Sequence, residues 1–186
     1  MRIAISGAQS TGKSTLLAAL RAHPKFKDFV VRDETTRNVL RGVLGVEKME
    51  INENGTDDTQ RLIIAQHLAN SINAHGPNVL YDRCALDGVV YTHYLYMHNK
   101  VSKQTFRIAQ SIFENVRYDI WFYIPPEFEP IRDGERSVNT EFRDDIVKLF
   151  DEYIASYGIP TVNLSGTVEE RVAQVIRIME ESNEAM

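Results

Sequence analysis

Short apolar runs alternate along this chain with longer segments in which apolar residues recur at helical spacing. The runs typical of strands lie at about 2–6, 29–31, 78–82, 120–124 and 161–164. The segments typical of helices lie at about 13–22, 35–44, 57–74, 85–98, 102–115, 140–157 and 167–180. This alternation predicts an α/β fold, a five-stranded parallel sheet flanked by helices.

Local signals support several of these boundaries. Pro125 and Pro126 directly follow the fourth apolar run, and proline cannot continue a central strand. Gly158 is placed as a C-terminal helix cap. Thr167 precedes Glu170 by three residues, which is the spacing of an N-terminal capping box. We expect the tail 181–186 to be frayed.

Composition fits one ordinary globular domain spanning 1–186. With 186 residues, the chain is long enough for one well-buried core. The net charge of −5 gives no global attraction to nucleic acid or to an anionic membrane. Cys84 is the only cysteine, so neither an internal disulfide nor a cysteine-cluster metal site can form. The first 30 residues lack the apolar core of a signal peptide, and no run approaches the ~18 apolar residues of a membrane span, so we expect a cytoplasmic protein.

The first apolar run leads directly into residues 7–14, which match G-x-x-x-x-G-K-[ST] without a mismatch. Strand, glycine-rich turn and helix form the context that this motif requires, which favours it over a turn that merely links two elements. The glycines let backbone N–H groups converge on a phosphate, and the helix N-terminus adds further donors. The predicted nucleotide-binding residues are Gly7, Gln9, Ser10, Thr11, Gly12, Lys13, Ser14 and Thr15.

Two of these residues have a defined chemical role. Lys13 can reach the β- and γ-phosphates, and the Ser14 hydroxyl can ligate Mg²⁺. The sequence therefore predicts that the chain binds ATP and Mg²⁺.

In open parallel sheets, ligands lie at the carboxyl ends of the strands. Asp33 and Glu34 follow the second predicted strand, with Arg37 three residues on. A carboxylate here could orient or deprotonate an acceptor hydroxyl, or it could simply cap the following helix. Because two adjacent carboxylates cannot both cap, we favour Glu34 as a functional residue and expect Asp33 and Arg37 beside the substrate.

Asp82 and Arg83 follow the third predicted strand. A carboxylate at this place normally holds Mg²⁺ through water or touches the acceptor. Arg83 would contact substrate or phosphate; the alternative is a surface ion pair. Asp87 could hydrogen-bond the substrate or only start a helix. Tyr91 could stack on a base, although core packing is the more frequent reason for aromatic residues at helical spacing.

A charged segment at about 126–138 follows the fourth predicted strand, and we interpret it as a lid over the phosphates. It contains Arg132 and Arg136, and Arg143 lies early in the next helix. Arginine suits phosphate because its planar fork pairs two oxygens and stays charged. A closing lid also excludes water, which favours transfer to an acceptor over hydrolysis. The alternative is a solvated loop in which acidic neighbours balance the arginines.

Together these residues resemble the P-loop AAA-type ATPase/kinase family that includes the NadR-type ribosylnicotinamide kinase domain and many phage-encoded proteins. They also resemble, more loosely, deoxynucleoside and thymidylate kinases. The residues that carry the resemblance are 7–14, Glu34 with Arg37, Asp82-Arg83 with Asp87, 133–137, Arg143, and Glu170-Arg171.

This resemblance implies a role for each matching residue. Lys13 and Ser14 would serve the triphosphate and Mg²⁺, and Glu34 or Asp82 would meet the acceptor hydroxyl. Arg83 would lie on the acceptor side. The arginines expected at the transferred phosphoryl group are Arg132, Arg136 and Arg143, with Arg132 also beside the bound nucleotide.

Two departures from the deoxynucleoside kinases leave the acceptor open. Cys84 stands where those kinases usually have serine, and the acidic pair Asp33-Glu34 is followed by threonine rather than by proline.

Three functions remain in consideration. The first is a kinase that moves the γ-phosphoryl group of Mg-ATP to a nucleoside or nucleoside monophosphate. The second is a kinase acting on a modified nucleotide within DNA or on a polynucleotide end; the acidic net charge counts against it, although Arg32, Arg37 and Arg41 could form a local basic strip. The third is a nucleotide-gated interaction module without phosphoryl transfer. The chain could also form a homodimer.

Overall fold

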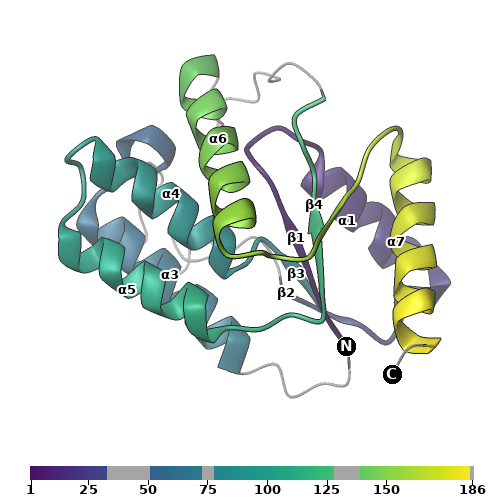
Figure 1. Ribbon diagram of the computed structural model, residues 1–186. Coiled ribbons are helices and arrows are strands. Elements are labelled where there is room, and N and C mark those ends of the chain that lie inside the picture. The colour runs from purple at the N-terminus through teal and green to yellow at the C-terminus, as the bar shows by residue number, and fades with distance from the viewer. Residues whose placement is uncertain (33–50, 73–77, 128–138, 185–186) are drawn as a thin grey trace.

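The structure is a computed structural model that describes residues 1–32, 51–72, 78–127 and 139–184. Its five strands form one sheet in the order β2-β3-β1-β4-β5, and every pair is parallel (Figure 1). The predicted parallel sheet is therefore confirmed. The strands are β1 (Arg2–Ser6), β2 (Val30–Arg32), β3 (Val79–Asp82), β4 (Ile120–Tyr123) and β5 (Thr161–Asn163).

Helices cover both faces of this sheet. Figure 1 shows α1 and α7 on one side and α3, α4, α5 and α6 on the other. The helices are α1 (Lys13–Ala22), α3 (Asp57–Ile72), α4 (Ala85–Met97), α5 (Lys103–Asn115), α6 (Thr140–Ser156) and α7 (Val168–Glu184). Two short 3-10 helices, η1 (Pro24–Phe26) and η2 (Asn52–Asn54), were not predicted. The helix predicted at 35–44 lies outside the described residues.

Each face of the sheet has its own apolar core. Ile3 and Ile5 of β1 pack with residues of α1 and α7, whereas Ala4 packs with residues of α4 and α6. Side chains alternate between the two faces of a strand, so β1 contributes to both cores. This burial on both faces explains why the predicted strands are continuous apolar runs rather than alternating ones.

The capping predictions hold, and one prediction at the C-terminus is wrong. Gly158 follows α6 with a φ of 57°, and Thr167 and Glu170 form the reciprocal capping box at 2.7 and 3.3 Å. The tail does not fray at residue 181, because α7 continues to Glu184. An ion pair between Arg177 and Glu181 at 2.9 Å supports this extra turn.

The central position of β1 determines where a ligand can bind. Ile5 lies opposite Asp82 of β3, and Ser6 lies opposite Tyr123 of β4. The carboxyl ends of the three central strands therefore meet at one edge, beside residues 7–14, as expected for an open parallel sheet. In the described ranges, no helix is both long and apolar enough to span a bilayer.

Candidate active site

The loop between β1 and α1 is curled so tightly that Gly7 accepts no side chain. Its φ is 149°, and a Cβ atom there would lie 2.6 Å from the backbone oxygen of Ile124. Gly12 begins α1 from a left-handed conformation with a φ of 89°. The two glycines of the motif thus hold a turn in which successive backbone N–H groups can converge on an anion.

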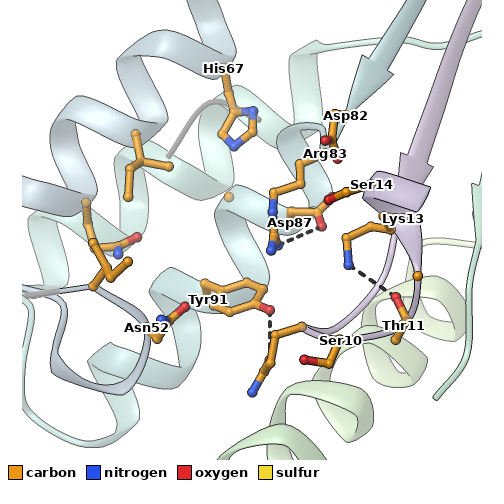
Figure 2. Close-up of a pocket in the computed structure, with 16 residues that line it drawn as sticks. Ser10, Thr11, Lys13, Ser14, Asn52, His67, Asp82, Arg83, Asp87 and Tyr91 are labelled. Atoms are coloured by element: carbon orange, nitrogen blue, oxygen red, sulfur yellow. Dashed lines mark hydrogen bonds and ion pairs between the residues drawn. The ribbon is translucent and has the colours of Figure 1, made fainter. Parts of the chain in front are cut away.

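Lys13 lies inside this loop, with only 5% of its surface exposed. Its Nζ donates hydrogen bonds to the backbone oxygens of Gly7 at 2.7 Å and Ala8 at 2.5 Å. It also donates to Thr11 Oγ1 at 3.2 Å (Figure 2). The ammonium group is thereby positioned within the curl, where phosphate oxygens can take over these hydrogen bonds.

Arg171 of α7 supports the loop from the other side. Its side chain is buried, and Nη1 donates to the backbone oxygen of Thr11 at 2.8 Å. Its Nη2 pairs with Glu127 Oε2 at 3.0 Å, and the same oxygen accepts from the Gly166 N–H at 3.1 Å. The sequence pointed to Arg171 only through the family resemblance. The structure shows that it joins the loop to the segments that follow β4 and β5.

Asp87 organises the turn after β3. Its carboxylate is 2% exposed, and Oδ2 accepts from Ser6 Oγ at 2.8 Å and from the Cys84 N–H at 3.0 Å. Its Oδ1 lies 3.5 Å from Arg83 Nη1. Asp87 therefore does help to start α4, one of the two roles considered for it. Its ion pair with Arg83 is largely buried and does not lie at the surface.

Arg83 has an unusual backbone conformation for a residue with a side chain. Its φ is 69°, and its N–H donates to the backbone oxygen of Ile5 at 3.1 Å. Such a left-handed conformation costs roughly 1–2 kcal/mol and persists only when neighbouring contacts fix it. The Asp87 carboxylate and the Ile5 carbonyl supply those contacts, so the guanidinium is held at the pocket.

Tyr91 connects this turn to the phosphate loop. Its hydroxyl donates to Gln9 Oε1 at 3.0 Å, and its ring lies 5.4 Å from Arg83 Cζ (Figure 2). Burial raises the pKa of Tyr91, so the hydroxyl remains a donor near neutral pH. Tyr94, one helical turn away, packs instead against Phe142 in the core.

These residues line one pocket (Figure 2). The loop contributes Lys13 and Ser14, the turn after β3 contributes Asp82 and Arg83, and α4 contributes Tyr91. The structure brings these predicted residues to one pocket, because the segments that carry them follow neighbouring parallel strands. The remaining lining residues are Gln9, Ser10, Thr11, Gly12, Ile51, Asn52, Gln60, Ile63, His67, Asp87 and Gly88.

Sequence reasoning missed the wall that α3 contributes. Gln60, Ile63 and His67 line the pocket from this helix. Burial lowers the pKa of His67 to about 4; the neighbouring Asp87 opposes the shift and Arg83 adds to it. The spacing of three and four residues places the three side chains on one helical face. This spacing was the only sequence signal for the wall. A helical face that packs only against a core shows the same spacing, so the signal does not distinguish the two.

Not every predicted site residue lies at this pocket. Gly7 begins the loop and lies against Ile124, Thr15 is exposed on the first turn of α1, and Arg143 is buried in α6; none of the three lines the pocket. Five further predicted residues lie outside the described residues: Asp33, Glu34, Arg37, Arg132 and Arg136.

The oxygens needed for Mg²⁺ are present. The Ser14 hydroxyl and the Asp82 carboxylate both line the pocket beside Lys13 (Figure 2). Magnesium prefers such hard oxygen ligands and is usually held by one or two protein groups together with substrate phosphates. The donor set therefore fits the predicted metal.

Several solved kinase structures share this fold. A deoxyadenosine kinase from M. mycoides superposes with a TM-score of 0.69 and 15% identity, over 97% of this chain and 100% of that one. Thymidylate kinase from Candida albicans gives a TM-score of 0.67 and 17% identity, over 97% and 91% of the chains. NadR in complex with NAD and AMP-PNP gives a TM-score of 0.69 and 18% identity. The match covers 97% of this chain but only 49% of the NadR chain. At these identities the likeness shows the P-loop kinase fold.

The sequence comparisons point to the same group. No curated protein matched the chain in sequence. Residues 2–171 match the sequence profile of a family described as an AAA domain. This match covers most of the chain, from β1 to Arg171. The chain therefore belongs to this AAA-domain family of P-loop proteins.

Proposed function

We propose that the protein is a kinase that transfers the γ-phosphoryl group of Mg-ATP to a nucleoside or nucleoside monophosphate. The observation that carries this proposal is the continuity of the pocket, which runs from Lys13 in the phosphate loop to a wall formed by Asp87, Arg83 and Tyr91. A protein that only binds or hydrolyses ATP has no need of a polar pocket that extends beyond the phosphate loop in this way. The deoxyadenosine and thymidylate kinases among the structural neighbours support this class of acceptor.

The triphosphate would bind along the curled loop. Backbone N–H groups of the loop and the start of α1 would donate to its oxygens, and Lys13 would move from the carbonyls of Gly7 and Ala8 to the β- and γ-phosphates. Ser14 and Asp82 would hold Mg²⁺, which neutralises charge on the phosphate oxygens when bound. Arg171 keeps the loop in shape because it holds the Thr11 carbonyl.

Transfer itself would depend on position and charge. The acceptor hydroxyl oxygen attacks the γ-phosphorus, the bond to the β–γ bridging oxygen breaks, and ADP leaves. The hydroxyl proton passes to a carboxylate, for which Asp82 and Glu34 are the two candidates. Arg83, fixed by Asp87, faces the acceptor. Arg132, Arg136 and Arg143 are proposed to stabilise the charge on the transferred group.

The test is ADP release from Mg-ATP across an acceptor panel. The panel contains deoxynucleosides, ribonucleosides, their monophosphates, nicotinamide riboside, and single- and double-stranded DNA with ordinary and hydroxymethylated pyrimidines. Lys13→Ala is the blank. Strong stimulation by one small acceptor supports the proposal and names its substrate. Stimulation by DNA alone would instead favour a kinase that acts on a nucleotide within DNA or on a polynucleotide end. If no acceptor stimulates ADP release although ATP still binds, a nucleotide-gated interaction module would be the remaining interpretation.

A further inference from the structure

The α3 wall of the pocket presents two polar ends separated by an apolar middle. Gln60 and His67 are seven residues apart, which corresponds to about 10 Å along the helix axis, and Ile63 lies between them. This spacing is close to the length of a nucleoside. Asn52 lies in the segment just before α3, so the Gln60 end is polar as well.

His67 occupies the end of this wall nearest the turn after β3. Figure 2 shows its ring extending from α3 towards Arg83 and Asp87. The ring also lies against α4, because a Cβ atom at Gly88 would lie 3.1 Å from His67 Cδ2. A glycine at this position lets the imidazole come close to the helix and remain beside the predicted point of transfer.

The imidazole is buried and polar, and in the part of the chain that the structure describes no hydrogen bond holds it. Its exposed fraction is 4%, and within the described ranges neither ring nitrogen has a hydrogen-bond partner. A ring nitrogen that lines a pocket can form a hydrogen bond with a ligand bound there. A neutral imidazole has one donor and one acceptor, which matches the two roles of a hydroxyl group.

The described lining carries balanced charge. Its cations are Lys13 and Arg83, and its carboxylates are Asp82 and Asp87. Lys13 is positioned for the triphosphate, and Arg83 already faces Asp87 at 3.5 Å. His67 stays neutral at physiological pH because burial lowers its pKa to about 4. Among the described lining residues, the two cations are therefore matched by two carboxylates.

From these observations, and resting on the proposed kinase function, we propose that His67 hydrogen-bonds a sugar hydroxyl of the acceptor nucleoside or nucleoside monophosphate. The phosphoryl group is transferred at Asp82 and Lys13, so the sugar of the acceptor must lie at the His67 end. The base then extends along Ile63 towards Gln60. His67 is thus a specificity residue for the sugar.

Binding tests this assignment without requiring turnover. Calorimetry would titrate a nucleoside, and separately its 5′-monophosphate, into protein saturated with Mg-AMP-PNP. The wild-type affinities identify which of the two compounds is the acceptor. His67→Leu should weaken nucleoside binding about 3- to 10-fold, the effect of losing one net hydrogen bond, and leave AMP-PNP binding unchanged. His67→Asn or His67→Gln should restore part of the affinity.

Two further variants separate loss of contact from loss of structure. His93→Gln is the matched control, since His93 is a half-buried histidine that contacts Tyr153 at 3.3 Å and lies outside the pocket lining. It should leave nucleoside affinity unchanged. Gly88→Ala should push the His67 ring aside and weaken nucleoside binding, while the preference of a helix interior for alanine over glycine offsets part of the cost of this crowding.

Each outcome decides between the two proposals. Equal nucleoside affinity in wild type and His67→Leu would overturn the role of His67 while the kinase proposal stands. Absence of binding by both the nucleoside and its monophosphate would also overturn this inference. Nucleoside binding that depends on His67, without any phosphoryl transfer in the turnover assay, would show the contact with His67 but reject the kinase proposal and, with it, the acceptor role of the bound nucleoside.

Discussion

Removing the Asp87 carboxylate should both destabilise the protein and disable the acceptor side of the pocket. The carboxylate accepts hydrogen bonds from Ser6 Oγ at 2.8 Å and the Cys84 N–H at 3.0 Å, and it faces Arg83. Hydrogen bonds to a charged group contribute about 1.5–3 kcal/mol each. Allowing for partial relaxation, Asp87→Ala should lower the free energy of unfolding by about 3–4 kcal/mol.

Asp87→Asn separates the two effects. The amide oxygen can still accept from Ser6 or Cys84, so the stability loss should be about 1–2 kcal/mol. Arg83 loses its charged partner, however, and its left-handed backbone at a φ of 69° loses one of the contacts that fix it. We expect acceptor-stimulated ADP release to fall more than tenfold, while affinity for AMP-PNP stays unchanged because the phosphate loop is untouched.

Urea unfolding, calorimetric AMP-PNP binding and the acceptor assay measure these quantities. Asp58→Asn is the matched control, since Asp58 is 91% exposed and its pair with Arg61 at 3.9 Å lies on the surface. It should leave the unfolding midpoint and the turnover unchanged. The reasoning is wrong if Asp87→Ala unfolds within about 1 kcal/mol of wild type, or if Asp87→Asn keeps full acceptor stimulation.

Three further predictions follow from buried groups. Arg171→Ala should lower the free energy of unfolding in urea by about 2–3 kcal/mol, because Thr11 and Glu127 lose their shared partner. It should also weaken AMP-PNP binding. Unchanged nucleotide affinity would show that the loop needs no support from α7. Burial lowers the pKa of His67 from 6.5 to about 4, so the unfolded chain takes up this proton first. From pH 6.5 to pH 4, wild type should therefore lose about 3 kcal/mol more stability than His67→Leu; parallel pH profiles would contradict the neutral, buried imidazole. Burial also raises the pKa of the Cys84 thiol, so a thiol reagent should label the protein only after unfolding; rapid labelling of the folded protein would refute this.

The parts of the site that the sequence predicted carry local signals. Gly7 and Lys13 belong to one contiguous motif, and Asp82 directly ends an apolar run. Because parallel strands place their carboxyl ends at one edge, knowing where each strand ends was enough to bring these residues together. The glutamate and the two arginines expected at 34, 132 and 136 remain predictions, since they lie outside the described residues.

The parts that the sequence did not reveal depend on tertiary structure. His67 and Gln60 follow a helical spacing that is equally typical of a core face, and only the packing of α3 beside α4 shows that this face lines a pocket. Arg171 donates to Thr11 across 160 positions of sequence. No local pattern predicts such a contact. The left-handed turn at Arg83 is also invisible in the sequence, because that conformation usually favours glycine.

The most direct test of the kinase account follows the γ-phosphoryl group itself. Mg-ATP labelled at the γ-phosphate would be incubated with the protein and the nucleoside that stimulates it most, with Lys13→Ala as the blank. The account predicts that the label appears on the nucleoside in step with ADP release. Label recovered only as inorganic phosphate, at a rate that no acceptor changes, would contradict it.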